Sequence, residues 1–310
     1  MAALAIRAAL NAQAPIARAR ARLLPSVAGA LPRLHLQDGP IDLIIIARGE
    51  PEMVEAAYRA ARIRFLTILD ELTRELPLLR AEAGPSVPAA DGAIAQRMQQ
   101  VVRPLTPWGF ITPMAAVAGA VAEAVLAAMP RAAPRLRLAA VNNGGDIALH
   151  LAEGERFTIG MVARPDPNKL YPGGADLFGR FEITARDAAR GIATSGWRGR
   201  SFSLGIADAV TVLARTAAAA DAAATLIANA VDLPGHAGIL RAPASALQPD
   251  SDLGERLVTR GVPALQPDEV AQALARGRAR AEALRKRDLI LQAALHLQGQ
   301  TVISGEATDG

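Results

Sequence analysis

The chain has 310 residues, of which 51% are hydrophobic and 21% charged, so it can bury a sizeable core and is too polar for a membrane protein. It has no cysteine, which excludes disulfides, thiolate catalysis and cysteine-ligated zinc. The net charge is only +4, and the basic residues are scattered without an aromatic platform beside them. We therefore expect neither a nucleic-acid partner nor a membrane partner.

The first 30 residues are rich in Ala and Arg, and no acidic residue precedes Asp38. The apolar stretch is short and Arg7 interrupts it, which favours an N-terminal arm or amphipathic helix over a targeting signal. We expect a cytoplasmic protein. No repeat, linker or break in composition divides the rest of the chain, so residues 31–300 are predicted to form one domain and residues 301–310 a disordered tail.

Hydrophobic periodicity predicts helices and strands that alternate without a strict βαβ rhythm. Residues 34–49 are predicted to form two strands around a turn at 38–40, because a β-branched run follows the turn. Residues 51–79 are predicted to be helical, because apolar positions recur every three or four residues after a Pro-Glu start. Further helices are expected within 92–105, 108–130 and 271–286, and a strand followed by a helix within 207–231. Further strands are expected at 136–141, 147–151, 157–163, 181–184, 191–194 and 289–296, and a loop at 165–179.

This order of elements predicts the α+β class. We expect a single domain with a central, largely antiparallel sheet packed by helices.

Three clusters of Gly, Ser, Thr and Asp carry the chemistry, and the first is Asn142–Asp146. Adjacent glycines (Gly144 and Gly145) let the backbone approach a ligand closely and present N–H groups to an anion. Asn143 adds an amide, and Asp146 could bond a ribose hydroxyl, a ring N–H or the turn itself. A plain structural turn is the alternative.

The second cluster lies within residues 191–208. Thr194 and Ser195 supply hydroxyl groups, Gly196 supplies a flexible N–H, and Arg198 and Arg200 supply cations, which together suit a phosphate. The segment is not a Walker loop, because it has no Gly-Lys-Ser/Thr. A solvated turn is the alternative.

The third cluster is the alanine-rich segment that contains Asp221 and Thr225. Four residues apart on a helix, these two side chains share one face. Mg²⁺ takes oxygen ligands and often only one or two from protein, with phosphate and water completing the octahedron. The alternative is that Asp221 caps a helix that begins there and that Thr225 is simply packed.

In their order and spacing, the stretches NNGGDI, ATSG and ADAAAT resemble the ApbE-like superfamily of FAD:protein FMN transferases. The resemblance spans about residues 113–231 and points to a cytoplasmic branch of that superfamily. It implies FAD as ligand or substrate, Mg²⁺ as cofactor, and transfer of FMN to a threonine hydroxyl of a target protein with release of AMP. It leaves open whether the chain forms a homodimer.

The resemblance also implies roles for single residues. Asp221 and Thr225 would bind Mg²⁺. The flavin nucleotide would be bound by the residues Gly119, Asn143, Gly144, Gly145, Asp146, Thr194, Ser195, Gly196 and Arg200.

Two departures from the family pattern bear on activity. Ala118 stands where the family has a lysine before the glycine, and the family's His-x-x-Asp-Pro segment is matched only by Asp208. None of the four histidines falls at that place. The proton acceptor for the attacking hydroxyl is therefore expected to be Asp208 or Asp146.

Three functions remain open from the sequence. The first is a Mg²⁺-dependent enzyme that attacks the FAD pyrophosphate, either as an FMN transferase or as an FAD pyrophosphohydrolase. The second is a non-catalytic module that binds a flavin or another nucleotide. The third is an enzyme that acts on another phosphorylated or pterin-like substrate.

Overall fold

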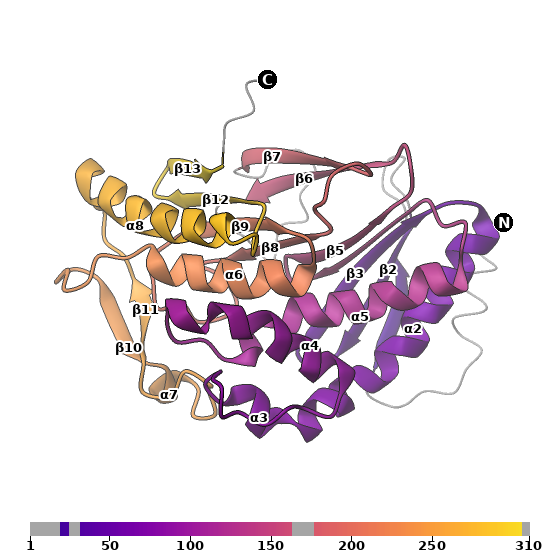
Figure 1. Ribbon diagram of the computed structural model, residues 1–310, viewed down its shortest axis with the longest axis horizontal. Coiled ribbons are helices and arrows are strands. Elements are labelled where there is room, and N and C mark those ends of the chain that lie inside the picture. Colours follow the sequence, from indigo (N-terminus) through magenta and orange to yellow (C-terminus); the bar gives the residue numbers. More distant parts are fainter. Residues whose placement is uncertain (1–18, 25–31, 163–176, 306–310) are drawn as a thin grey trace.

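The computed structural model describes residues 19–24, 32–162 and 177–305. These residues form a mixed α+β domain with one large antiparallel sheet, which confirms the predicted fold class (Figure 1). The sheet has nine strands in the order β1-β2-β3-β4-β5-β8-β9-β12-β13. Their bounds are β1 Arg20–Leu24, β2 Arg33–Asp38, β3 Ile41–Arg48, β4 Leu138–Asn143, β5 Asp146–Leu151, β8 Gly191–Ser195, β9 Ala209–Ala214, β12 Gln292–Leu297 and β13 Gln300–Ser304.

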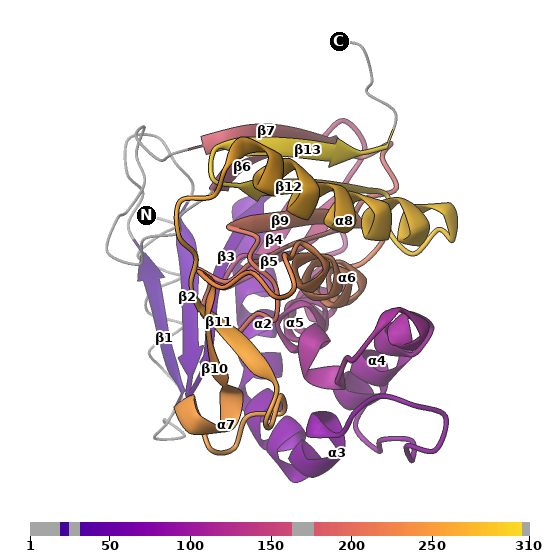
Figure 2. The same cartoon turned by 90° about the vertical axis from the view of Figure 1, so that its left-hand side faces the viewer.

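One face of this sheet carries the helices. Residues with period-two burial, such as Ala139 and Val141 of β4, point to this face and join the main core. Helix α2 packs on α5, α5 packs on α6, and α6 packs on α8 (Figures 1 and 2). The helices of this side are α2 Pro51–Arg74, α3 Leu76–Arg80, α4 Ala93–Val102, the 3₁₀ turns η1 Arg103–Trp108 and η2 Pro113–Ala116, α5 Val117–Ala132, α6 Ala217–Ala230 and α8 Pro267–Lys286.

The other face is covered by a two-stranded ribbon, β6 (Arg156–Val162) with β7 (Leu177–Thr184). Leu138 and Ala140, which alternate along β4 with Ala139 and Val141, lie in a smaller core together with Ile159 and Ile183 of the ribbon. The nine-stranded sheet is therefore apolar on both faces where the ribbon crosses it.

A second ribbon, β10 (Leu240–Pro243) with β11 (Leu257–Gly261), carries the short helix α7 (Ala244–Leu247). In both views α7 lies beside α3 at the same end of the molecule (Figures 1 and 2). An ion pair between Arg80 of α3 and Asp250, 2.6 Å long, joins the two segments. This contact places residues 248–253 at the edge of a pocket that also reaches α5 and α6.

Two predicted boundaries are wrong. Residues 20–24, expected in an arm or helix, form β1 at the edge of the sheet, and residues 301–304, expected in a disordered tail, complete β13. Backbone pairing with β2 and β12 orders these segments. Each is only four or five residues long, so its sequence carries little of the alternation that predicts a strand. The remainder of both segments, and most of the predicted loop at 165–179, lies outside the described residues; 177–179 belong to β7.

The predicted helix at 51–79 is in fact two helices. Helix α2 ends at Arg74, and α3 begins at Leu76 with Pro77 in its first turn. Proline has no N–H to continue the α2 ladder, but it is tolerated in a first turn. The hydrophobic period continues across this break, which is why the period alone does not reveal it.

The stretch Pro113–Ala132 is apolar enough, with a mean hydropathy of 1.5 over its best window, to cross a membrane by length and composition. In the structure it contains η2 and α5, which pack against α2, α4, α6 and the sheet. Its apolar character is explained by burial in the core of the domain.

Candidate functional site

The Asn142–Asp146 cluster is a hairpin turn that side-chain hydrogen bonds stabilise. Asn143 pairs with Asp146, and Gly144 and Gly145 form the two-residue loop with φ of +69° and +120°. Both φ values favour glycine. The side chain of Asn142 accepts a 2.8 Å hydrogen bond from the N–H of Gly145, which closes the turn.

The hairpin is tied to helix α5. The Asn143 amide donates a 3.2 Å hydrogen bond to the carbonyl of Ala118. Asp146, at the start of β5, accepts a 3.2 Å hydrogen bond from the N–H of Thr194 on β8. The first two clusters therefore meet at the side chain of Asp146.

The third cluster sits where the N-terminal ends of α5 and α6 cross. The Asp221 side chain, on α6, accepts a 2.9 Å hydrogen bond from the N–H of Gly119 in the first turn of α5. Glu123 of α5 in turn accepts a 2.7 Å hydrogen bond from the N–H of Ala218 in the first turn of α6. Each helix thus supplies a carboxylate to the positive end of the other.

The alternative in which Asp221 caps its own helix is wrong. Helix α6 begins four residues earlier, at Ala217, and its cap is Thr216, whose hydroxyl accepts from the N–H of Ala219. The crossing also requires a residue without a side chain on α5. A Cβ on Gly119 would lie 2.3 Å from the carbonyl oxygen of Ala217.

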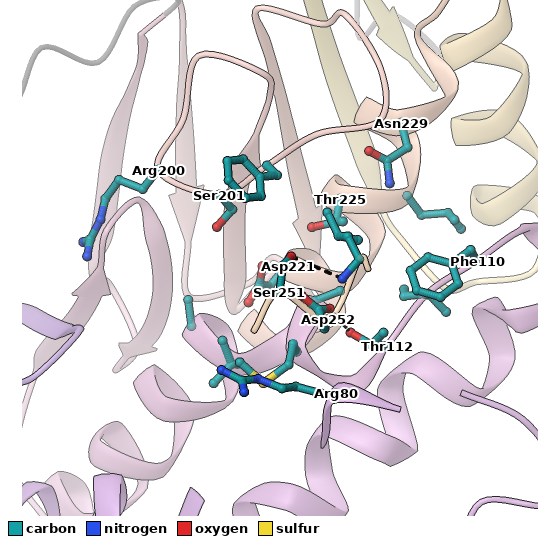
Figure 3. A pocket seen from close by; sticks show the side chains of 18 of the residues that line it. Arg80, Phe110, Thr112, Arg200, Ser201, Asp221, Thr225, Asn229, Ser251 and Asp252 are labelled. Atoms are coloured by element: carbon teal, nitrogen blue, oxygen red, sulfur yellow. Dashed lines mark hydrogen bonds between the residues drawn. The ribbon is translucent and has the colours of Figure 1, made fainter. Parts of the chain in front are cut away.

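Asp221 and Thr225, on two successive turns of α6, line one pocket (Figure 3). Asp146 of β5 lines the same pocket. The pocket has a volume of about 300 Å³, at the low end of the range for ligand sites. Its other lining residues are Arg80, Phe110, Ile111, Thr112, Met114, Ala115, Val117, Ala118, Arg200, Ser201, Phe202, Leu226, Asn229, Gln248, Asp250, Ser251, Asp252 and Leu253.

The two carboxylates of Asp146 and Asp221 are half-buried and repel one another. Burial raises the pKa of Asp146 to about 7 and outweighs the N–H of Thr194, which lowers it. Burial, and next the charge of Asp146, hold the pKa of Asp221 well above its ordinary value, against the hydrogen bonds from Gly119 and Ala118. A cation bound between them would relieve both costs.

These donors fit Mg²⁺, since all are oxygen atoms of carboxylate or hydroxyl groups. In the described part of the chain, no group of three His, Asp or Glu side chains could hold a metal by itself. The remaining ligands would therefore come from water and from an anionic ligand, as is usual for Mg²⁺.

Of the predicted nucleotide-binding residues, Asp146 and Arg200 line the pocket. Arg200 donates a 3.2 Å hydrogen bond to the carbonyl of Pro40 and passes close to Gly144. The other seven are not among the residues that line the pocket. These are Gly119, Asn143, Gly144, Gly145, Thr194, Ser195 and Gly196.

Two of these seven residues have a visible structural reason. A Cβ on Gly196 would lie 2.4 Å from the carbonyl oxygen of Asp208, so this glycine allows two backbone segments to touch. The hydroxyl of Thr194 lies 2.9 Å from that of Thr211 on the neighbouring strand β9. The strand predicted at 191–194 is part of β8, and the Thr194 hydroxyl of the predicted phosphate cradle bonds within the sheet.

Asp208 is not among the residues that line the pocket, and its side chain makes an ion pair and hydrogen bonds with other residues. Its side chain is nearly buried and pairs with Arg198 at 2.6 Å. It also accepts hydrogen bonds from the indole N–H of Trp197 at 3.2 Å and from the N–H of Gln298 at 2.7 Å. We therefore assign Asp208 a structural role in place of the predicted proton-accepting one.

Replacing Asp208 with asparagine tests this assignment. We expect a loss of about 1–3 kcal/mol in the free energy of unfolding, because a buried, charge-assisted contact to Arg198 is lost. Chemical denaturation measures this loss. Ligand binding in the pocket is expected to stay within about twofold of wild type. A variant of unchanged stability that no longer turns over its substrate would restore Asp208 to the catalytic site.

Sequence reasoning missed the wall of the pocket that includes Arg80, Phe110 and residues 248–253. These segments are 140 to 170 residues apart in the chain and meet through the contacts of Arg80 with Asp250 and of Thr112 with Asp252. Asp250-Ser251-Asp252 reads as an ordinary polar loop between a proline and a glycine, so the sequence carries no local sign of a site here.

Comparison with known proteins identifies the family. The family model described as AbpE bacteria matches residues 21–303 of the chain. The chain belongs to this family. The ApbE-like membership predicted from the three clusters is thereby confirmed.

The chain is also similar to archaeal relatives and to a solved structure. A UPF0280 protein of Methanosphaerula palustris is 32% identical over 205 residues, which cover 64% of this chain and 77% of the relative. A UPF0280 protein of Methanothrix thermoacetophila is 35% identical, over 60% of this chain and 73% of the relative. The structure titled flavinyl transferase ApbE, apo form, from Pseudomonas stutzeri aligns over 94% of this chain and 96% of its own, with a TM-score of 0.42 and 11% identity.

Proposed function

We propose that this ApbE-like protein binds FAD together with Mg²⁺ in the pocket between α5, α6 and residues 248–253, and breaks the FAD pyrophosphate. The FMN half would pass to a hydroxyl group, either of a threonine in an acceptor protein or of water, and AMP would leave. The observation that carries the proposal is the convergence of Asp146, Asp221 and Thr225 on one pocket. Membership of the family supports it.

Different residues of the pocket would bind the metal, the pyrophosphate and the flavin ring. Asp146, Asp221 and Thr225 would hold Mg²⁺, which when bound neutralises pyrophosphate charge and makes the phosphorus easier to attack. The N-terminal end of α5, which meets the pocket at Val117 and Ala118, favours an anion nearby. Phe110, Met114 and Leu226 line the pocket with apolar surface suited to a flat ring.

The pocket also supplies cations despite the loss of the family lysine at Ala118. Arg80 and Arg200 line it from different segments. Arg80 is held by Asp250, while Arg200 reaches across to the β2–β3 turn. Arginines in these positions would pair with phosphate oxygens of the ligand and thereby offset the missing lysine.

Titration calorimetry with FAD, with and without Mg²⁺, tests the proposal. We expect measurable FAD binding in Mg²⁺ that weakens at least about tenfold when EDTA removes the metal, because the pyrophosphate would then face two uncompensated carboxylates. Equal FAD binding in both conditions would favour a non-catalytic flavin-binding module. Absence of FAD binding would contradict the proposal and favour another phosphorylated or pterin-like substrate.

A further inference from the structure

The loop of residues 248–253 is fixed to the opposite wall of the pocket. Arg80 pairs with Asp250 at 2.6 Å, and the hydroxyl of Thr112 donates a 2.5 Å hydrogen bond to Asp252 Oδ2. Directly after the loop, the guanidinium of Arg256 lies 3.3 Å from the ring centroid of Phe110. Three contacts within seven residues hold this loop in one position against residues 80–112.

Asp252 is oriented by this arrangement. It lines the same pocket as Asp221, and Figure 3 shows its carboxylate between Asp221 and Thr112. Thr112 is buried, with 2% of its surface exposed, and caps the 3₁₀ turn η2. A rigid hydroxyl on one carboxylate oxygen fixes the direction of the other.

Attack by a hydroxyl group on a phosphorus needs a proton acceptor, and the fold leaves one suited carboxylate. Four aspartates line the pocket in the part of the chain that the structure describes. Asp146 and Asp221 are the proposed metal ligands, and Asp250 is neutralised by Arg80. Asp252 accepts its hydrogen bond from the hydroxyl of Thr112, which, unlike Arg80 at Asp250, brings no positive charge to the carboxylate.

We propose that Asp252 is the proton acceptor of the reaction, an inference that rests on the proposed function. The hydroxyl oxygen of the acceptor forms a bond to the phosphorus on the FMN side, and the bond from that phosphorus to the bridging oxygen breaks. AMP leaves with the bridging oxygen and its electron pair. The hydroxyl proton passes to Asp252 and from there to solvent. Thr112 acts as a positioning residue through its hydrogen bond to Asp252.

Matched aspartate-to-asparagine variants inside and outside the pocket test the inference. AMP release from FAD, with water as the acceptor, is measured at saturating Mg²⁺ for Asp252→Asn, for Asp268→Asn in the exposed first turn of α8, and for wild type. We expect Asp252→Asn to lower kcat about 10²–10⁴-fold. Its dissociation constants for FAD and for Mg²⁺ are expected to stay within about threefold of wild type, since asparagine still accepts the bond from Thr112. Asp268→Asn, which lies outside the pocket, is expected to keep kcat within about twofold.

Rescue by a small acid separates catalysis from structure. Sodium formate is expected to raise the rate of AMP release by Asp252→Ala at least about tenfold, because formate can occupy the vacated space and accept the proton. An Asp252→Asn variant with wild-type kcat would overturn the inference and leave the proposed function standing. So would a variant that loses Mg²⁺ affinity about tenfold or more, since Asp252 would then be a metal ligand. Wild-type protein that binds FAD with Mg²⁺ but releases no AMP, either with water alone or with an added threonine-containing acceptor peptide, would overturn both.

Discussion

Replacing Asp221 with asparagine is expected to weaken Mg²⁺-dependent FAD binding by about 100-fold or more and to abolish AMP release. The variant keeps an oxygen that can accept the N–H of Gly119, so the crossing of α5 and α6 is preserved. What it loses is the charge that holds a hard cation. Calorimetry with FAD in Mg²⁺ measures the effect, and Asp268→Asn is the matched control, because it removes an exposed carboxylate that does not line the pocket.

The same variant carries a second expectation that does not depend on turnover. In the absence of Mg²⁺, Asp221→Asn is expected to be more stable than wild type by about 1–3 kcal/mol, because it removes one of two buried charges that repel each other. Denaturation in EDTA measures this gain. If Asp221→Asn instead destabilises the metal-free protein and binds FAD as wild type does, Asp221 has a purely structural role.

Replacing Gly119 with alanine is expected to cost about 2–4 kcal/mol of the free energy of unfolding. The new Cβ would lie 2.3 Å from the carbonyl oxygen of Ala217, and both atoms belong to helix backbones that cannot move independently. Urea denaturation of the two proteins provides the measurement.

Gly84→Ala is the control for this prediction. Nothing lies within 4 Å of a Cβ at Gly84, so the free energy of unfolding of Gly84→Ala is expected to differ from wild type by less than about 0.5 kcal/mol. If Gly119→Ala is as stable as Gly84→Ala, the close approach of α5 and α6 is not required, and the predicted contact of Gly119 with the nucleotide becomes the better explanation of that glycine.

The sequence was informative where the chain signals its own local structure. The β-branched run at 41–46 and the Asn-Gly turn before Asp146 predicted strands and a hairpin that the structure contains, because period-two burial and positive φ leave direct traces in residue choice. The positions of Asp221 and Thr225 on one helix face followed in the same way from a spacing of four.

The sequence was uninformative where function depends on contacts between distant segments. Nothing in the sequence near Gly119 indicates that this glycine makes room for Ala217. Nor does it indicate that Asp221 of α6 accepts an N–H from α5 while Glu123 of α5 accepts one from α6. Such contacts are set by how α5 and α6 cross, which depends on the whole core. The same holds for Asp252, whose orientation comes from Thr112, 140 residues earlier.

Crystals of the protein with FAD and Mn²⁺, which prefers the same oxygen ligands as Mg²⁺ and scatters anomalously, would show directly where ligand and metal sit. We predict an anomalous peak within about 2.0–2.3 Å of an Asp221 carboxylate oxygen, with the FAD pyrophosphate beside it in the same pocket. An FAD molecule bound elsewhere, or a metal remote from both Asp146 and Asp221, would contradict the proposed site.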